Sequence, residues 1–183
     1  MKNIKTFPEQ KQNLPGNEHQ MNPEPEIIRE NYAGSGKLLG KVAFITGGDS
    51  GIGRSVAVHF AREGADIAIV YLKEDKDAKD TKALVEKEGR QCLLISGDLK
   101  DEKFCKTAIK KCHTTFKKLN ILVNNAGFGT YGYVWETDHE SECKMLQLNM
   151  LNVYQLTRYF LKEMILRNSG WIINISSISA FQP

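Results

Sequence analysis

The fold is decided by one stretch of 13 residues, Val42-Ala43-Phe44-Ile45-Thr46-Gly47-Gly48-Asp49-Ser50-Gly51-Ile52-Gly53-Arg54. It opens on a short apolar run, which is typical of a strand buried on both faces of a parallel sheet. Glycines follow at once, and residues 55–62 continue with apolar side chains at helical spacing. The stretch therefore predicts a strand, a tight turn and a helix, whose N-terminus offers free N–H groups and a positive dipole end to an anion.

Apolar runs and amphipathic segments alternate along the rest of the chain. They predict strands at 67–70, 92–95, 121–123 and 171–175, and helices at 75–88, 101–116 and 138–167. Thr137 and Glu140 fit a capping box at the start of the last helix. Parallel strands need crossovers of this length. The predicted fold class is α/β, a doubly wound parallel sheet of the Rossmann type with helices on both faces.

The composition suits one soluble domain: 183 residues, 41% of them hydrophobic, with a net charge of +3. The basic residues of 106–118 are predicted to form a solvated helix face, so we expect no nucleic-acid partner. No apolar stretch reaches the ~18 residues of a membrane span, and no signal peptide is visible. The four cysteines form no metal-binding or C-x-x-C spacing, so we expect reduced thiols, no metal and a cytoplasmic location.

The first 38 residues differ from the rest of the chain. They are polar, contain four of the five prolines and show no sustained period. We expect an extended arm, either disordered or laid along the surface. Gly34-Ser35-Gly36 then precedes a domain that covers residues 39–183.

Four motifs follow predicted strands in order. They are Thr46-Gly47-x-x-x-Gly51-x-Gly53, Gly97-Asp98-Leu99, Asn124-Asn125-Ala126-Gly127 and Ser176-Ser177. With these motifs, residues 39–183 resemble the short-chain dehydrogenase/reductase family, and the N-terminal part resembles its bacterial subgroup often labelled glucose/ribitol dehydrogenase-like. The resemblance implies an NAD(P)-binding Rossmann domain of a homo-oligomeric enzyme. Such an enzyme is an oxidoreductase that transfers hydride between a nicotinamide and a small-molecule alcohol or carbonyl substrate.

The resemblance also implies roles for single residues. Ser177 would contact the substrate, and it is preferred to Ser176 because strand alternation from Ile175 places the two on opposite faces. Asn149 would hold a water in a proton relay. Asn152 competes with it for this role, and a bond from the Asn152 side chain to the backbone is the alternative. The implied cofactor-binding residues are Thr46, Gly47, Asp49, Ser50, Gly51, Ile52, Gly53, Tyr71, Asp98, Leu99, Asn125, Ala126 and Gly127.

The choice between NAD and NADP stays open at this point. An acidic residue at the end of the second strand would bind the ribose 2′-hydroxyl and favour NAD. Tyr71 stands there instead, followed by Leu72. Arg54 and Lys73 could reach a 2′-phosphate, with solvated surface charge as the alternative interpretation.

The resemblance breaks at the C-terminus. The family's general acid/base is the tyrosine of Tyr-x-x-x-Lys, which its motif spacing places about 13 residues after Ser177. The sequence ends at Pro183 and holds about five of the family's seven strands. Loss of a general acid/base costs typically 10²–10⁴-fold in rate, so we expect this chain to be nearly inactive. The alternative is a non-catalytic fragment that binds a dinucleotide or pairs with another subunit.

Overall fold

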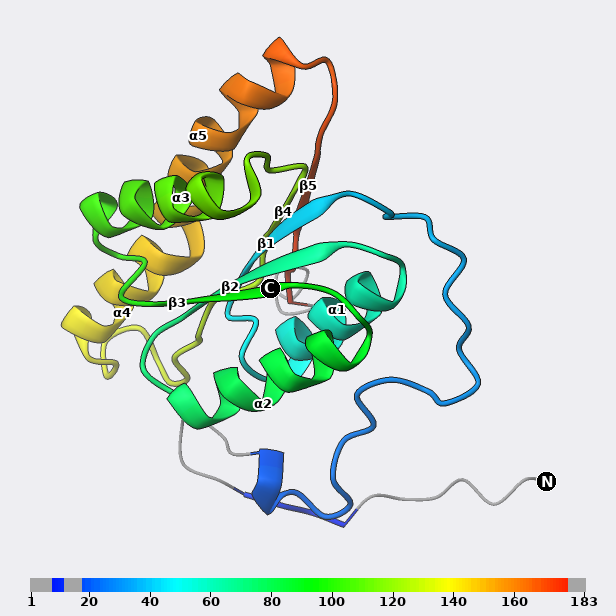
Figure 1. Ribbon diagram of the computed structural model, residues 1–183. Helices are drawn as coiled ribbons and strands as arrows, with labels where there is room; N and C mark the ends of the chain where they lie inside the picture. The colour runs from blue at the N-terminus through cyan, green and yellow to red at the C-terminus, as the bar shows by residue number, and fades with distance from the viewer. Residues whose placement is uncertain (1–7, 12–17, 178–183) are drawn as a thin grey trace.

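The computed structural model describes residues 8–11 and 18–177, so the predictions for residues 1–7 and 12–17 of the arm lie outside it. The strands form one parallel sheet in the order β3-β2-β1-β4-β5 (Figure 1). The predicted α/β, doubly wound fold class is confirmed. The strands are β1 (Val42–Thr46), β2 (Asp66–Tyr71), β3 (Cys92–Ser96), β4 (Ile121–Asn124) and β5 (Trp171–Asn174).

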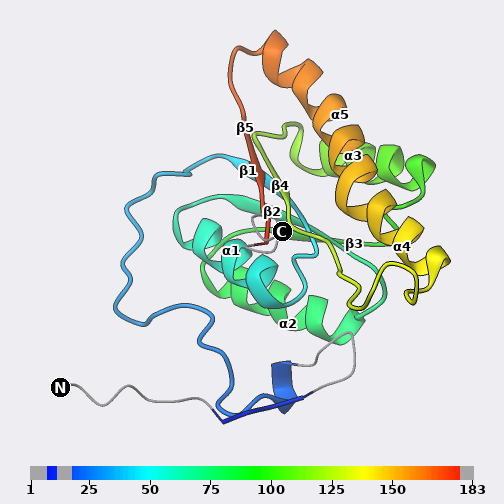
Figure 2. The ribbon, with the colours of Figure 1, turned by 180° about the vertical axis from the view of Figure 1, so that it is seen from behind.

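Helices cover both faces of the sheet (Figures 1 and 2). On one face lie α1 (Gly51–Arg62) and α2 (Asp75–Lys87). On the other lie α3 (Glu102–Phe116), α4 (His139–Leu146) and α5 (Val153–Leu166). Side chains of β1 alternate between two cores: Val42 and Phe44 pack against α3 and α5, while Ala43 and Ile45 pack against α1 and α2. All four are fully buried, which explains why this strand is apolar throughout.

The segment predicted as one helix at 138–167 is correct in extent but wrong in two details. Its middle, η2 (Gln147–Asn152), is a π-helical segment between α4 and α5. The N-cap is Asp138, whose carboxylate accepts from Ser141 N at 2.8 Å. Thr137 donates instead to Glu142 Oε1 at 2.6 Å, so the predicted capping box does not form. Asp138 takes the position because a carboxylate accepts the N3 N–H and also favours the positive end of the helix dipole.

Strand β5 is the least covered strand of the sheet. Within the described residues it pairs with β4 alone, from Ile121 opposite Trp171 to Asn124 opposite Asn174. Trp171 and Ile173 remain 49% and 37% exposed. An open apolar strand at a sheet edge is a surface on which other chains can pair.

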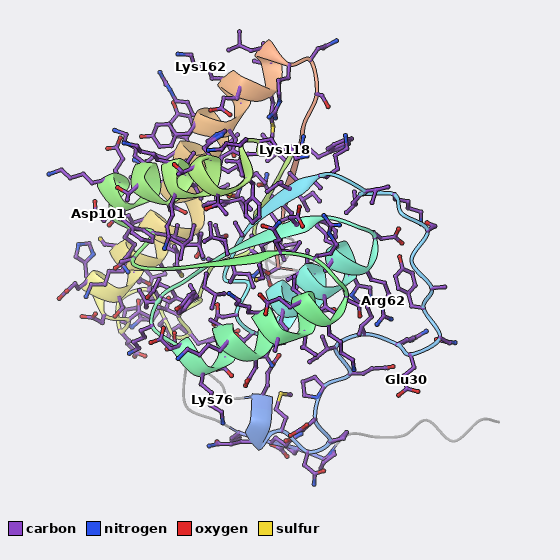
Figure 3. All side chains as sticks on the ribbon, viewed as in Figure 1. Glu30, Arg62, Lys76, Asp101, Lys118 and Lys162 are labelled. Atoms are coloured by element: carbon purple, nitrogen blue, oxygen red, sulfur yellow. The ribbon has the colours of Figure 1, made fainter. Side chains whose placement is uncertain are left out.

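The arm from residue 18 onward lies along α1. Ser55 Oγ donates to the carbonyl of Ile27 at 2.8 Å. Arg62, near the end of α1, donates from Nη1 to the carbonyls of Arg29 and Tyr32, both at 3.1 Å. Figure 3 labels Arg62 between α1 and this part of the arm. The contacts run the length of the helix, while the division of the chain at residue 38 stays a prediction.

Glu63, which follows α1, anchors the last part of the arm. Its carboxylate accepts from the hydroxyl of Tyr32 and from the N–H groups of Ser35 and Lys37, the latter two at 3.1 and 3.0 Å. These bonds, led by that of Tyr32, lower the pKa of Glu63 from 4.5 to about 2, against the raising effect of burial.

This pKa shift predicts a pH dependence of stability. A carboxylate with a depressed pKa in the folded state contributes its full stabilisation above its unfolded pKa and loses it as the pH falls to the folded value. For Glu63 that window runs from pH 4.5 down to about 2. The difference in unfolding free energy between the unmodified chain and Glu63→Gln, measured by urea denaturation, should be constant above the window and shrink within it. A difference that does not change with pH would contradict this assignment.

The cysteines form no disulfide, and three of them are buried. Burial raises the pKa of Cys92 to about 12, so this thiol stays protonated at neutral pH. In the described part of the chain, no group of His, Cys, Asp and Glu side chains has the arrangement of a metal site. None of the helices described here is long and apolar enough to cross a membrane.

Candidate functional site

The three motif glycines of the first turn have different tasks. Gly47 has a φ of +61°, which L side chains rarely adopt, and its N–H donates to the carbonyl of Val70 at 2.7 Å. Gly51 has a φ of +53° and faces open space. A Cβ on Gly53 would lie 2.0 Å from Gly47 O. Gly47 therefore makes the turn, Gly51 keeps it open, and Gly53 lets α1 approach the end of β1.

A network of hydrogen bonds joins this turn to the end of β4. Thr46 Oγ1 accepts from the N–H groups of Asn125 and Ala126 at 2.9 and 3.0 Å, and donates to Val123 O at 3.3 Å. Asn125 Nδ2 donates to the carbonyls of Thr46 and Gly47 at 3.0 and 2.9 Å. The chain leaves β1 and β4 in opposite directions across the sheet, so this is the switch point at which such sheets bind ligands.

A cavity of about 330 Å³ opens at this switch point. Its volume falls in the range of small-molecule sites, of which roughly 300 Å³ is the lower end. It extends from the glycine turn past the ends of β2 and β3 to the loop after β4. The lining residues are Gly47, Asp49, Ser50, Val70, Tyr71, Leu72, Glu74, Gly97, Asp98, Leu99, Lys100, Asn125, Ala126, Gly127, Phe128 and Leu148.

The structure brings together most of the predicted cofactor-binding residues. Nine of them line the cavity: Gly47, Asp49, Ser50, Tyr71, Asp98, Leu99, Asn125, Ala126 and Gly127. Thr46, Gly51, Ile52 and Gly53 belong to the turn but do not line the cavity. Sequence reasoning missed Val70, Leu72, Glu74, Gly97, Lys100, Phe128 and Leu148. Most of these lie within three residues of a strand end, so proximity to the strand ends could have found them.

Carboxylates dominate the charge of the cavity. Burial raises the pKa of Asp49, and the nearby Glu74 and Asp77 add to the rise. At Asp98 burial acts in the same direction, but Lys100 outweighs it through hydrogen bonds and its charge, so the pKa of Asp98 is lowered. Lys100 Nζ lies 3.0 Å from Asp98 Oδ1. Asp98 is therefore ionised and paired, while Asp49 and Glu74 give the β2 side of the cavity a negative character.

Arg54 does not have either role that the sequence allowed. Its side chain is 3% exposed, so it is not a solvated surface charge. Its guanidinium donates to Asp49 O, to Thr81 Oγ1 and to Asp77. These contacts hold it behind the turn, and it is not among the residues that line the cavity.

Segment η2 fixes the two loops on the far side of the cavity. Asn152 Nδ2 donates to Leu99 O at 2.7 Å, and Gln147 Nε2 donates to Lys100 O at 2.9 Å. Asn149 donates to Phe128 O at 2.8 Å and accepts from Phe128 N at 3.2 Å. The backbone-bonded alternative for Asn152 is confirmed. Asn149 also bonds to the backbone, and no pattern in the sequence predicted the π-helical turn that presents these amides.

Ser177 lies three residues after β5 and is exposed. It does not line the cavity. The end of β5 is held to β4 by Asn124 Nδ2, which donates to Asn174 Oδ1 at 2.8 Å. The two predicted catalytic residues thus lie at the β4–β5 side of the sheet. Neither Ser177 nor Asn149 is among the residues that line the cavity.

The family model of the short-chain dehydrogenases matches residues 41–183. The chain belongs to this family. Among its relatives, the uncharacterized oxidoreductase YhdF of Bacillus subtilis is 44% identical over 176 residues, which are 96% of this chain and 60% of YhdF. The glucose and ribitol dehydrogenase of Daucus carota is 39% identical over 184 residues, covering 96% of this chain and 62% of that protein. The chain thus spans about 60% of the length of these relatives.

Solved structures of dehydrogenases are similar to the described fold. One from Burkholderia cenocepacia, in complex with NADP, matches with a TM-score of 0.73 and 30% identity, over 80% of this chain and 59% of that one. An NAD⁺-bound xylitol dehydrogenase matches with a TM-score of 0.75 and 25% identity, over 80% and 56% of the two chains.

Proposed function

We propose that the cavity at the switch point binds NAD(P) and that the chain is the nucleotide-binding part of an oxidoreductase acting on an alcohol or carbonyl. One observation carries this proposal: the cavity at the ends of β1 and β4 is bounded by the glycine turn that opens α1. The N-terminal N–H groups of a helix have no partners within the helix, and the dipole favours an anion there. A diphosphate has the charge that such a turn stabilises.

The residues present fit a dinucleotide. Asp49 and Ser50, in the turn before α1, line the cavity, so a diphosphate could approach the backbone there. Asp98 would accept from the amino group of the adenine, because its carboxylate is ionised and lines the cavity. Ala126 and Gly127 are small and would leave room for the second ribose and the nicotinamide. When bound, NAD(P) supplies the hydride chemistry; the chain binds, orients and shields it.

Turnover requires a proton donor as well as hydride. We propose that Ser177 hydrogen-bonds the substrate and that Asn149 keeps the loop at Phe128 in place beside it. Residues 178–183 of the sequence given contain no tyrosine. We therefore propose that this 183-residue piece, assayed by itself, binds cofactor but oxidises or reduces substrates very slowly.

We infer a preference for NAD(H) over NADP(H). In this fold the ribose 2′-hydroxyl binds beyond the end of β2. There the cavity is lined by Asp49 and Glu74, and Arg54 is engaged behind the turn. Lys73 is exposed and is not among the lining residues. A 2′-phosphate would meet like charge, which at a partly solvated site costs roughly 1 kcal/mol or more.

Fluorescence titration of the purified chain tests the proposal. We expect saturable NADH binding and a Kd for NADPH at least about tenfold higher than that for NADH. In Glu74→Gln the ratio of these two Kd values should be smaller. With a panel of aldehydes added, NADH absorbance should hardly fall. Tighter binding of NADPH would contradict the inferred preference, rapid NADH oxidation would contradict the expected slow turnover, and a folded chain that binds neither cofactor would contradict the function.

A further inference from the structure

The arm reaches the glycine turn through one carboxylate. Glu18 begins a short 3₁₀ turn, η1 (Glu18–Gln20), that lies at the N-terminus of α1. Its Oε1 accepts from the N–H of Gly51 at 2.6 Å. Its Oε2 lies 2.5 Å from Nη1 of Arg54, and the Glu18 side chain is only 15% exposed. One carboxylate therefore serves the first N–H of the helix and a buried guanidinium together.

Arg54 connects Glu18 to the turn, because its guanidinium also bonds to the carbonyl of Asp49. Its Nε and Nη2 donate to the carbonyl of Asp49 at 3.0 and 2.8 Å. Thr81 Oγ1, which itself accepts from Arg54 Nε, donates to the same carbonyl at 2.7 Å. Three donors thus fix the Asp49 carbonyl from behind, while the Asp49 and Ser50 residues line the cavity in front.

We propose that Glu18 is a positioning residue for dinucleotide binding and that the arm is in this way part of the cofactor site. The inference rests on the proposed function. Arginine stays charged when buried, and a buried charge that loses its partner is strongly unfavourable. Without Glu18, Nη1 loses its carboxylate, and Asp77, whose Oδ1 lies 3.3 Å from Nη2, remains beside the guanidinium. The guanidinium then shifts towards Asp77 and water and releases the Asp49 carbonyl. The turn then no longer presents its N–H groups in one fixed geometry.

The position of Glu18 decides whether removal of its charge should weaken or strengthen nucleotide binding. It is not among the residues that line the cavity, so it does not occupy the volume proposed for the nucleotide. Removing its charge should therefore weaken binding of a diphosphate rather than free a blocked site. Adenosine, which has no phosphate, does not depend on the turn.

The test compares Glu18→Gln with Glu26→Gln in the full chain. Glu26 also lies on the arm, but its side chain is 67% exposed, and its Oε2 lies as far as 4.0 Å from Nε of the exposed Arg29. This weakly paired carboxylate is therefore a matched control. Calorimetry with NADH, ADP and adenosine should show Kd values for NADH and ADP raised about tenfold in Glu18→Gln, since a charge-assisted bond is involved. Adenosine should bind both variants equally, and Glu26→Gln should bind all three ligands like the unmodified chain.

Each other outcome overturns the inference. Unchanged NADH and ADP affinity in Glu18→Gln would show that the turn does not need the carboxylate. Tighter binding would make Glu18 a competitor of the phosphate. An equal loss for adenosine together with a lower melting temperature would show a role in stability alone. If the unmodified chain binds no NADH, the proposed function is wrong as well. If the unmodified chain binds NADH and Glu18→Gln binds it equally well, the inference about Glu18 alone is wrong.

Discussion

Replacing Gly53 by alanine should raise the Kd for NADH roughly 100-fold, the largest effect that we expect from a single methyl group. The new Cβ would lie 2.0 Å from Gly47 O and 2.6 Å from Asn125 Nδ2. Neither contact is the end of a flexible side chain, because the first is backbone and the second bridges two backbone carbonyls. Helix α1 must therefore move away from β1, and the turn between them changes shape.

Fluorescence titration with NADH measures this effect, and Gly129→Ala is the control. A Cβ on Gly129 meets nothing within 4 Å, and its φ lies outside the region that favours glycine. This variant should bind NADH like the unmodified chain. Near-normal NADH affinity in a folded Gly53→Ala variant would show that the diphosphate does not bind at the turn.

Replacing Thr46 by valine should lower the free energy of unfolding by about 2–5 kcal/mol, because it removes one acceptor from two backbone donors. The N–H groups of Asn125 and Ala126 both donate to Thr46 Oγ1. Thr46 is 2% exposed, so water cannot easily replace the lost oxygen. Valine keeps the shape, so the loss reports the hydrogen bonds rather than a cavity.

Urea denaturation of Thr46→Val and of Thr114→Val provides the comparison. Thr114 lies on the exposed side of α3, where its hydroxyl donates only to Lys110 O at 2.9 Å. Its replacement should change the free energy of unfolding by less than about 0.5 kcal/mol. Equal effects of the two substitutions would mean that the link between β1 and β4 contributes little to stability.

The sequence predicted the strands, the helices and the parallel sheet because the patterns that specify these elements are local in the sequence. An apolar run such as residues 42–46 has to be buried on both faces, and the glycines that follow it permit one kind of turn. Alternation of strands and helices then predicts parallel strands, since parallel strands require crossovers. Cavity residues after a strand end, such as Asp98 and Asn125, follow from the same rule.

The parts that the sequence did not reveal depend on contacts between distant segments. Arg54 looked like a surface charge because its partner Glu18 is 36 residues earlier in the chain and Thr81 is 27 later. The π-helical segment η2 has no local signature, and its amides find their acceptors only once the loops at Leu99 and Phe128 are in place. Pairings of this kind are set by the folded geometry and not by neighbouring residues.

The most direct test of the nucleotide site is a titration of the ¹⁵N-labelled chain with NADH, followed by the shifts of assigned backbone amides. If the cavity at the switch point binds the dinucleotide, the amides of Gly47, Ser50, Asp98 and Ala126 should shift in a saturable way. The chemical shift of the Gly89 amide, just beyond the C-terminal end of α2, should not change. A folded chain in which these four amides do not respond to saturating NADH would contradict the account.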